Sequence, residues 1–126
     1  MDLLDTQICE LIGEAGLRTL VAAFYRRVPA DEILGVMYPK EDLAGAEHRL
    51  GEFFIQRFGG PGRYSEARGH PRLRLRHAPF RVDVNARNRW LELMEAAMAE
   101  VNIPPEALGV LRKYFSDTAT FMVNQM

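Results

Sequence analysis

Three histidines are the residues of this sequence best suited to bind a metal or transfer a proton, because imidazole changes charge near neutral pH. They are His48, His70 and His77. His48 lies between Glu47 and Arg49 in a helical stretch, so we expect it to face solvent. His70 precedes a proline, which favours extended backbone. Neither position predicts a ligand.

His77 has apolar neighbours. Leu73 and Leu75 precede it, and Ala78, Pro79 and Phe80 follow it. In helical geometry Leu73 and His77 lie on the same face. A histidine in such surroundings is, taken alone, more often a packed core residue than a metal ligand, and both interpretations remain open at this point.

Three other chemistries lack their sequence patterns. A zinc site is not predicted, because Cys9 is the single cysteine and no two histidines have helical ligand spacing. Ser65 and Ser116 are the only serines, and neither lies in a nucleophile-elbow motif. The glycine-rich run at 59–62 lacks the lysine and the preceding strand of a phosphate-binding loop.

A basic stretch surrounds His77 and contains Arg68, Arg72, Arg74, Arg76 and Arg81. Nucleic-acid binding is one interpretation, but the net charge is −1, and neither a helix-turn-helix nor an aromatic stacking platform accompanies the arginines. A solvated basic surface is a simpler one. We prefer a third, in which some arginines pair with carboxylates of a buried cofactor.

The composition predicts one globular domain over residues 1–126, with 48% hydrophobic residues. No apolar run is long enough to span a bilayer, so we expect no membrane partner. The acidic N-terminus does not resemble a secretory signal, and one cysteine cannot form an internal disulfide. We therefore expect a cytoplasmic protein.

Helical periodicity predicts an all-α fold with four substantial helices. The first should end at Pro29 and the second should run from Asp42 to the glycines at 59–62. A short helical turn is expected at 32–36. The third helix should start near Asn85, and a proline pair at 104–105 should open the fourth. The expected core faces are Leu17, Leu20, Val21, Phe24 and Val28; then Ala46, Leu50, Phe53 and Phe54; then Trp90, Met94, Ala97, Met98 and Val101; and finally Leu108, Leu111, Phe115, Ala119 and Met122.

Residues 63–81 have poor periodicity and are expected to be irregular. The stretch 73–77 alternates like a strand, but Pro71 and Pro79 bracket it and it has no partner, so we interpret it as a short helix or turn. Nineteen structureless residues are unusual in a small domain, and a bound cofactor would order them.

Several motifs together resemble the group II truncated haemoglobins. They occur in that family's order between about residues 12 and 124 and comprise Phe24-Tyr25, Tyr38-Pro39, residues 42–47, Gly59-Gly60-Pro61, residues 69–80, Arg87, Trp90-Leu91 and Met94. One departure concerns the turn between the first two helices. The family has a glycine pair there, whereas this sequence has Ile12 before Gly13, and Gly16 could share the role.

The resemblance implies a two-on-two helical sandwich around haem b, with His77 as the proximal iron ligand. It places Tyr25, Tyr38 and Trp90 in the distal cage, where their polar hydrogens can bind a partly negative ligand. Ala46 matches the distal position at which many globins have histidine.

The resemblance also implies contacts with the edges and faces of the haem. Arg49, Tyr64 and Arg76 match positions that contact the propionates. The residues expected to pack on the macrocycle are Leu50, Phe53, Phe54, Leu73, Phe80, Val82, Met94 and Met122.

Three classes of function follow from this interpretation. We expect first a protein that binds dioxygen, carbon monoxide or nitric oxide at ferrous haem. The alternative is a redox enzyme, a nitric oxide dioxygenase or a peroxidase, that uses an external reductase. A haem-free helical interaction module is the third. Nucleic acid is not an expected partner, and relatives are monomers or homodimers.

Overall fold

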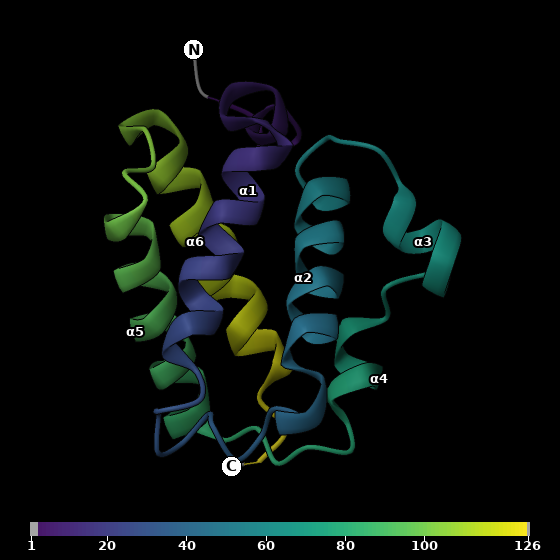
Figure 1. Ribbon diagram of the computed structural model, residues 1–126, viewed down its shortest axis with the longest axis vertical. Helices are drawn as coiled ribbons and strands as arrows, with labels where there is room; N and C mark the ends of the chain where they lie inside the picture. Colours follow the sequence, from purple (N-terminus) through teal and green to yellow (C-terminus); the bar gives the residue numbers. More distant parts are fainter. Residues whose placement is uncertain (1–2, 126) are drawn as a thin grey trace.

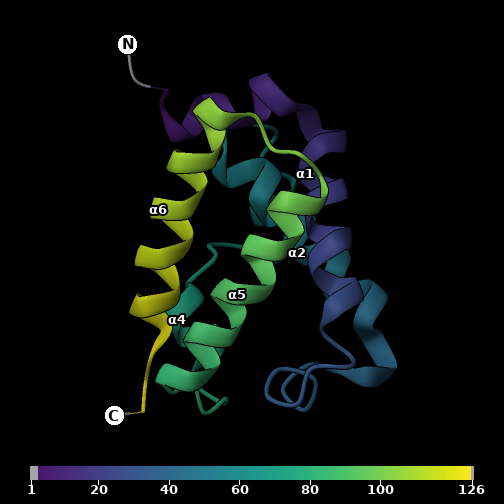
Figure 2. The same cartoon turned by 90° about the vertical axis from the view of Figure 1, so that its left-hand side faces the viewer.

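Four long helices form the body of the computed structural model, which describes residues 3–125. Helix α1 packs against α2, and α5 packs against α6. These two pairs meet through the contact between α1 and α5 (Figures 1 and 2). No strand is present in the described range, which confirms the all-α prediction. The long helices are α1 (Ile8–Arg27), α2 (Leu43–Arg57), α5 (Val84–Glu100) and α6 (Pro105–Met122), and the short ones are η1 (Asp5–Gln7), η2 (Lys40–Asp42), α3 (Arg63–Arg68) and α4 (Leu73–His77).

Helix α1 is divided by a kink at Gly13. The φ and ψ angles there are 77° and 163°, a conformation that side chains with a Cβ rarely adopt. Ile12 precedes it, and a Cβ on Gly16 would lie 3.2 Å from the Ile12 side chain. One glycine is therefore enough to form the turn, and Ile12 is tolerated beside it.

The ends of the long helices follow their local sequence. Asp42 occupies the N-cap position of α2. Gly59, just after α2, has a φ of 104°, and a Cβ there would lie 1.9 Å from the Thr6 carbonyl oxygen. Asp83 caps α5 by accepting a hydrogen bond from the Ala86 amide at 2.8 Å. These boundaries lie within one or two residues of the predicted ones.

The segment 63–81 is more regular than predicted. It contains α3, which packs against α2, and α4, which packs against α6, and it carries the chain across to α5 (Figure 1). Helices of six and five residues are too short to produce a periodic pattern. The expectation of an irregular stretch was thus wrong for α3, and the short-helix interpretation of 73–77 is confirmed.

The predicted core faces are largely buried. All five members of the first expected stripe, in α1 and its C-cap residue, are at most 1% exposed. In α6, Leu111, Phe115 and Met122 are buried, whereas Leu108 and Ala119 are half-buried. No helix of the described residues is long and apolar enough to cross a membrane.

A network of charged side chains fastens α3 to α1 and α2. The Glu52 carboxylate accepts from two arginines, because a guanidinium nitrogen of Arg18 and the Nε atom of Arg63 each lie 3.0 Å from one of its oxygens. Arg63 also pairs with Glu14. Burial alone would raise the pKa of the Glu52 carboxyl, but the hydrogen bonds from Arg63 and Arg18 outweigh it and leave the pKa below its ordinary value.

Candidate functional site

A cavity of about 360 Å³ lies between α2, α4, α5 and α6, and its walls are mainly apolar. Most residues predicted to form the site line this cavity, although they come from every part of the chain. They are Tyr25, Tyr38, Ala46, Arg49, Leu50, Phe53, Phe54, Tyr64, Leu73, Arg76, His77, Phe80, Val82, Trp90 and Met122. The fold therefore brings together residues nearly a hundred positions apart.

Met94 is the one predicted site residue that does not line the cavity. It is 1% exposed and lines a separate, smaller cavity with Leu91 and Met98. Its face of α5 is turned toward α6, so Met94 packs in the core here, and its contact with the macrocycle stays a prediction.

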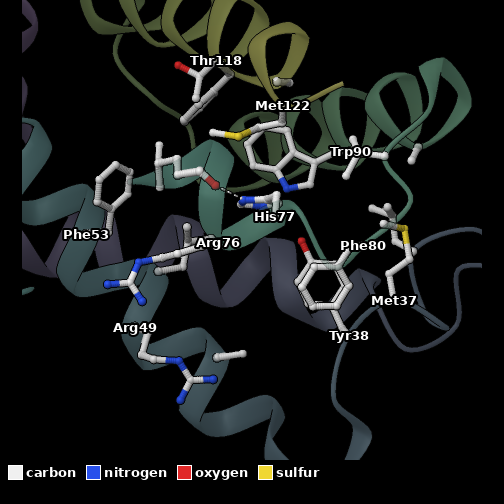
Figure 3. Close-up of a pocket in the computed structure, with 18 of the residues that line it drawn as sticks. Met37, Tyr38, Arg49, Phe53, Arg76, His77, Phe80, Trp90, Thr118 and Met122 are labelled. Carbon is white, nitrogen blue, oxygen red and sulfur yellow. Dashed lines mark hydrogen bonds between the residues drawn. The ribbon is translucent and has the colours of Figure 1, made fainter. Parts of the chain in front are cut away.

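His77 lies at the end of α4 and faces the cavity (Figure 3). Its Nδ1 atom is 2.7 Å from the carbonyl oxygen of Leu73, one helical turn earlier. A proton on Nδ1 satisfies that carbonyl and leaves Nε2 with a free lone pair, which is the form of imidazole that binds a metal. The structure thus provides an oriented ring in the tautomer that a ligand requires.

The segment after His77 is held by Asn124, which follows α6. The Asn124 side chain accepts a hydrogen bond from the Val82 amide at 2.9 Å and donates one to the Phe80 carbonyl at 3.0 Å. A longer bond of 3.4 Å reaches the His77 carbonyl. The Asn124 backbone amide also donates to Val82. One side chain therefore fixes the backbone that follows the histidine.

Three polar aromatic residues lie together in the cavity. Tyr25 and Tyr38 pack edge to face with ring centroids 5.6 Å apart, and Phe24 contacts the rings of both Tyr38 and Trp90. Figure 3 shows the Trp90 nitrogen and the Tyr38 hydroxyl directed toward one another. Burial raises the pKa of Tyr38 to about 12, and a hydrogen bond from Trp90 partly opposes this.

The same physical cause acts on Tyr25. Burial, followed by the proximity of Tyr38, raises the pKa of the Tyr25 hydroxyl far above its ordinary value. Both tyrosines therefore keep their protons at physiological pH and can donate hydrogen bonds.

Tyr38 is carried by a loop that is tied to α5. The Asp31 side chain accepts hydrogen bonds from the Ile33 and Leu34 amides at 3.0 and 2.8 Å. It also pairs with Arg89 at 3.2 Å, and its side chain is only 5% exposed. Because Arg89 precedes Trp90, this ion pair connects the loop of one polar aromatic residue to the helix of another.

Cationic side chains lie along another edge of the cavity. Figure 3 shows the guanidinium groups of Arg49 and Arg76 on the same side, away from Trp90. Arg49 pairs with Asp42 at 3.2 Å, and Arg76 donates through Nε to the Pro71 carbonyl at 2.7 Å. Tyr64 is buried below Arg76, whose guanidinium carbon is 5.8 Å from the tyrosine ring.

Ten lining residues were not assigned to the site from the sequence. Some were detectable: Phe115 and Ala119 share a face of α6 with Met122, and Arg87 lies one turn before Trp90 on α5. The others carry no local signal, because loops or helix packing bring them to the cavity. The ten are Leu34, Met37, Pro39, Arg68, Ala86, Arg87, Tyr114, Phe115, Thr118 and Ala119.

The cavity has the chemical features that haem requires. Apolar walls suit a macrocycle, cations at one edge suit its two carboxylates, and the lone pair of His77 suits its iron. Proton-donating aromatic groups suit a polar diatomic ligand. An all-helical sandwich with such a cavity and a single oriented imidazole defines a globin.

Comparison with known proteins identifies the family. The model of bacterial-like globins matches residues 7–124. The group 2 truncated hemoglobin YjbI of Bacillus subtilis is 39% identical over 92% of this chain and 87% of its own. The two-on-two hemoglobin-3 of Arabidopsis thaliana is 38% identical over 90% of this chain and 68% of its own.

Solved structures agree with this assignment. The hemoglobin of Chloroflexus aurantiacus has a TM-score of 0.90 and 46% identity, covering 94% of this chain and 98% of that one. A truncated haemoglobin of Bacillus subtilis has a TM-score of 0.89 and 38% identity, covering 93% and 98%. The chain belongs to the bacterial-like globin family and, within it, to the group II truncated haemoglobins. This membership implies a haem cofactor and diatomic ligands.

Proposed function

We propose that the protein binds haem b in the described cavity and holds dioxygen reversibly on the ferrous iron. The single observation that carries this proposal is the His77 ring, which has its Nδ1 atom fixed by Leu73 and faces the cavity. Haem supplies the iron that binds the gas. The chain supplies the axial nitrogen, the apolar walls and the polar groups around the ligand.

Each part of the cavity has its own role in this proposal. His77 is the proximal ligand through Nε2, and Arg49, Tyr64 and Arg76 hold the propionates. Tyr25, Tyr38 and Trp90 donate hydrogen bonds to the bound ligand, because all three carry polar hydrogens into an apolar cavity. Ala46 is small and donates nothing, so the ligand depends on the other three.

The density of proton donors favours slow release of dioxygen. One of the similar solved structures is described as oxygen-avid. Slow release suits tight storage or chemistry on the bound gas better than rapid delivery. A redox role, as a nitric oxide dioxygenase or a peroxidase supplied by an external reductase, is therefore the second candidate function.

One set of measurements separates these functions. Purified protein should show the visible absorption of five- or six-coordinate haem, shift it on adding carbon monoxide and bind dioxygen reversibly. Sustained turnover of nitric oxide or peroxide with a supplied reductant supports the redox role. A protein that takes up no haem from solution is a haem-free module, and both haem functions are then wrong.

A further inference from the structure

The arginines of this chain fall into two classes. The sequence has fourteen, and eight of them pair with a carboxylate in the structure. The six others have no carboxylate partner among residues 3–125. All six lie in one stretch of the chain, and they are Arg68, Arg72, Arg74, Arg76, Arg81 and Arg87.

The clustering is not a result of general basicity. The whole chain carries a net charge of −1, yet residues 63–81 contain six arginines and one glutamate. The rest of the molecule is therefore acidic. A strong local positive field in an otherwise negative protein orients an approaching partner of opposite charge.

Three of these guanidinium groups are held in place by neutral acceptors. Arg87 donates to the Asn88 side-chain oxygen at 2.9 and 3.1 Å. Arg74 donates to the Phe121 and Val123 carbonyls at 3.0 and 3.3 Å. Arg76 donates to the Pro71 and Arg68 carbonyls at 2.7 and 2.8 Å. Carbonyl oxygens fix the geometry of these groups but do not cancel their charge, so the positive field remains.

The unpaired arginines adjoin the cavity that is proposed to bind haem. Arg68, Arg76 and Arg87 line it, and Arg68 is exposed, so the cavity reaches the surface at this edge. Arg72 and Arg81 are exposed and do not line the cavity. Two propionates can neutralise at most two of the six charges, which leaves an exposed basic surface beside the cavity edge. We call the exposed residues Arg68, Arg72, Arg74 and Arg81 the basic rim.

We propose that the basic rim docks an acidic one-electron carrier protein that reduces the ferric iron of this globin. The inference rests on the proposed haem function and names the partner that a redox cycle needs. The carrier gives up one electron, ferric iron takes it and becomes ferrous, and no covalent bond forms or breaks. Charge complementarity selects the partner, and the adjacent cavity edge shortens the distance that the electron crosses.

The test uses the haem-loaded ferric protein and flavodoxin, an acidic flavoprotein that carries single electrons. Binding of oxidised flavodoxin is measured by calorimetry at low and high salt, and reduction by the hydroquinone form is followed by stopped flow. Arg72→Glu and Arg81→Glu each reverse one exposed charge outside the cavity. Lys113→Glu makes the same charge change on α6, where the lysine side chain is 80% exposed.

We expect the double variant Arg72→Glu/Arg81→Glu to weaken binding and slow reduction by about tenfold or more at low ionic strength. The effect should nearly disappear at 0.5 M salt, where exposed charges are screened within about 4 Å. Lys113→Glu should stay within about twofold of the native protein. Reduction by dithionite, the haem spectrum and the dioxygen off-rate should be unchanged.

If Lys113→Glu weakened flavodoxin binding and slowed reduction as much as the rim variants do, the proposal would be overturned, since net charge alone would then explain the effect. It is also overturned if native protein binds anionic vesicles or nucleic acid through these arginines but not flavodoxin. Native protein that shows no haem spectrum marks a failure of the proposed function instead, so the two failures are distinguishable.

Discussion

The buried carboxylate of Asp31, in the loop that carries Tyr38, lies 3.2 Å from a guanidinium nitrogen of Arg89, the residue that precedes Trp90 on α5. Two members of the proposed distal cage are therefore held at a fixed spacing by an ion pair that touches neither of them. The Asp31 carboxylate also orders its own loop through two backbone amides.

Arg89→Met should loosen the position of Tyr38 while leaving the turn at Asp31 intact. It leaves a buried carboxylate without its cation, at a cost of about 1–3 kcal/mol in unfolding free energy. We expect the dioxygen off-rate to rise several-fold and the carbon monoxide off-rate to change less. Stopped-flow displacement measures both. Lys113→Met, which removes an exposed cation, is the control, and an equal response of the two gases would refute the coupling.

Trp90→Phe removes the indole N–H but keeps an aromatic ring beside Tyr38. Hydrogen bonds to a partly anionic dioxygen are worth about 1.5–3 kcal/mol, so the dioxygen off-rate should rise by roughly 10- to 150-fold. Carbon monoxide is less polar and should respond less. An unchanged dioxygen off-rate in this variant and in Tyr25→Phe/Tyr38→Phe would show that the three residues only pack.

His77→Gly should remove the axial nitrogen and leave space beside Leu73 for a free imidazole. We expect the native absorption spectrum to be lost and then partly restored when millimolar imidazole is added. His48→Ala, which alters an exposed histidine, should keep the native spectrum. A carbon monoxide complex of His77→Gly that is identical to the native one without imidazole would contradict the proximal assignment.

Asn124→Ala removes three side-chain hydrogen bonds to the segment after His77. Since a neutral bond contributes about 1 kcal/mol, the rate of haem loss to excess apomyoglobin should rise by roughly fivefold or more. Gln125→Ala is the matched control, because only its backbone amide contacts Val82. If both variants lose haem at the native rate, Asn124 does not support the proximal side.

Glu52→Gln should reduce stability in a pH-dependent way. The folded protein holds the pKa of this carboxyl below its ordinary value of 4.5, so the carboxylate stabilises the fold above that pH. The stabilisation is lost as the pH falls through the folded-state pKa. Urea unfolding should give a deficit of about 1–2 kcal/mol at pH 7 that shrinks below pH 4.5. Glu66→Gln, on an exposed residue of α3, is the control.

The sequence was sufficient to predict the four long helices, since their apolar stripes repeat with the helical period over many turns. It also contains the family motifs from which the proximal role of His77 is predicted. It could not give α3, because six residues leave no periodic pattern. The position of Met94 outside the cavity lining has a related cause. The spacing of Met94 from Trp90 predicts a shared face, but helix packing decides which part of that face borders the cavity.

The ion pairs between distant segments could not be predicted from the sequence either. Asp31 and Arg89 are ordinary surface residue types whose pairing depends on how α1 and α5 pack. The partition of the arginines into paired and unpaired classes also required the fold, since the sequence shows a basic stretch but not where the carboxylates lie.

The position of Asn124 also has a consequence for biosynthesis. It is 47 residues beyond His77, and a ribosome adds about 5–20 residues per second, so it is made roughly 2 to 9 seconds later. During that interval the nascent chain holds the proposed iron ligand but lacks the hydrogen bonds that fix the segment after it. Firm retention of haem must therefore follow the completion of α6, and the newly made chain passes through a stage in which the prosthetic group can still exchange.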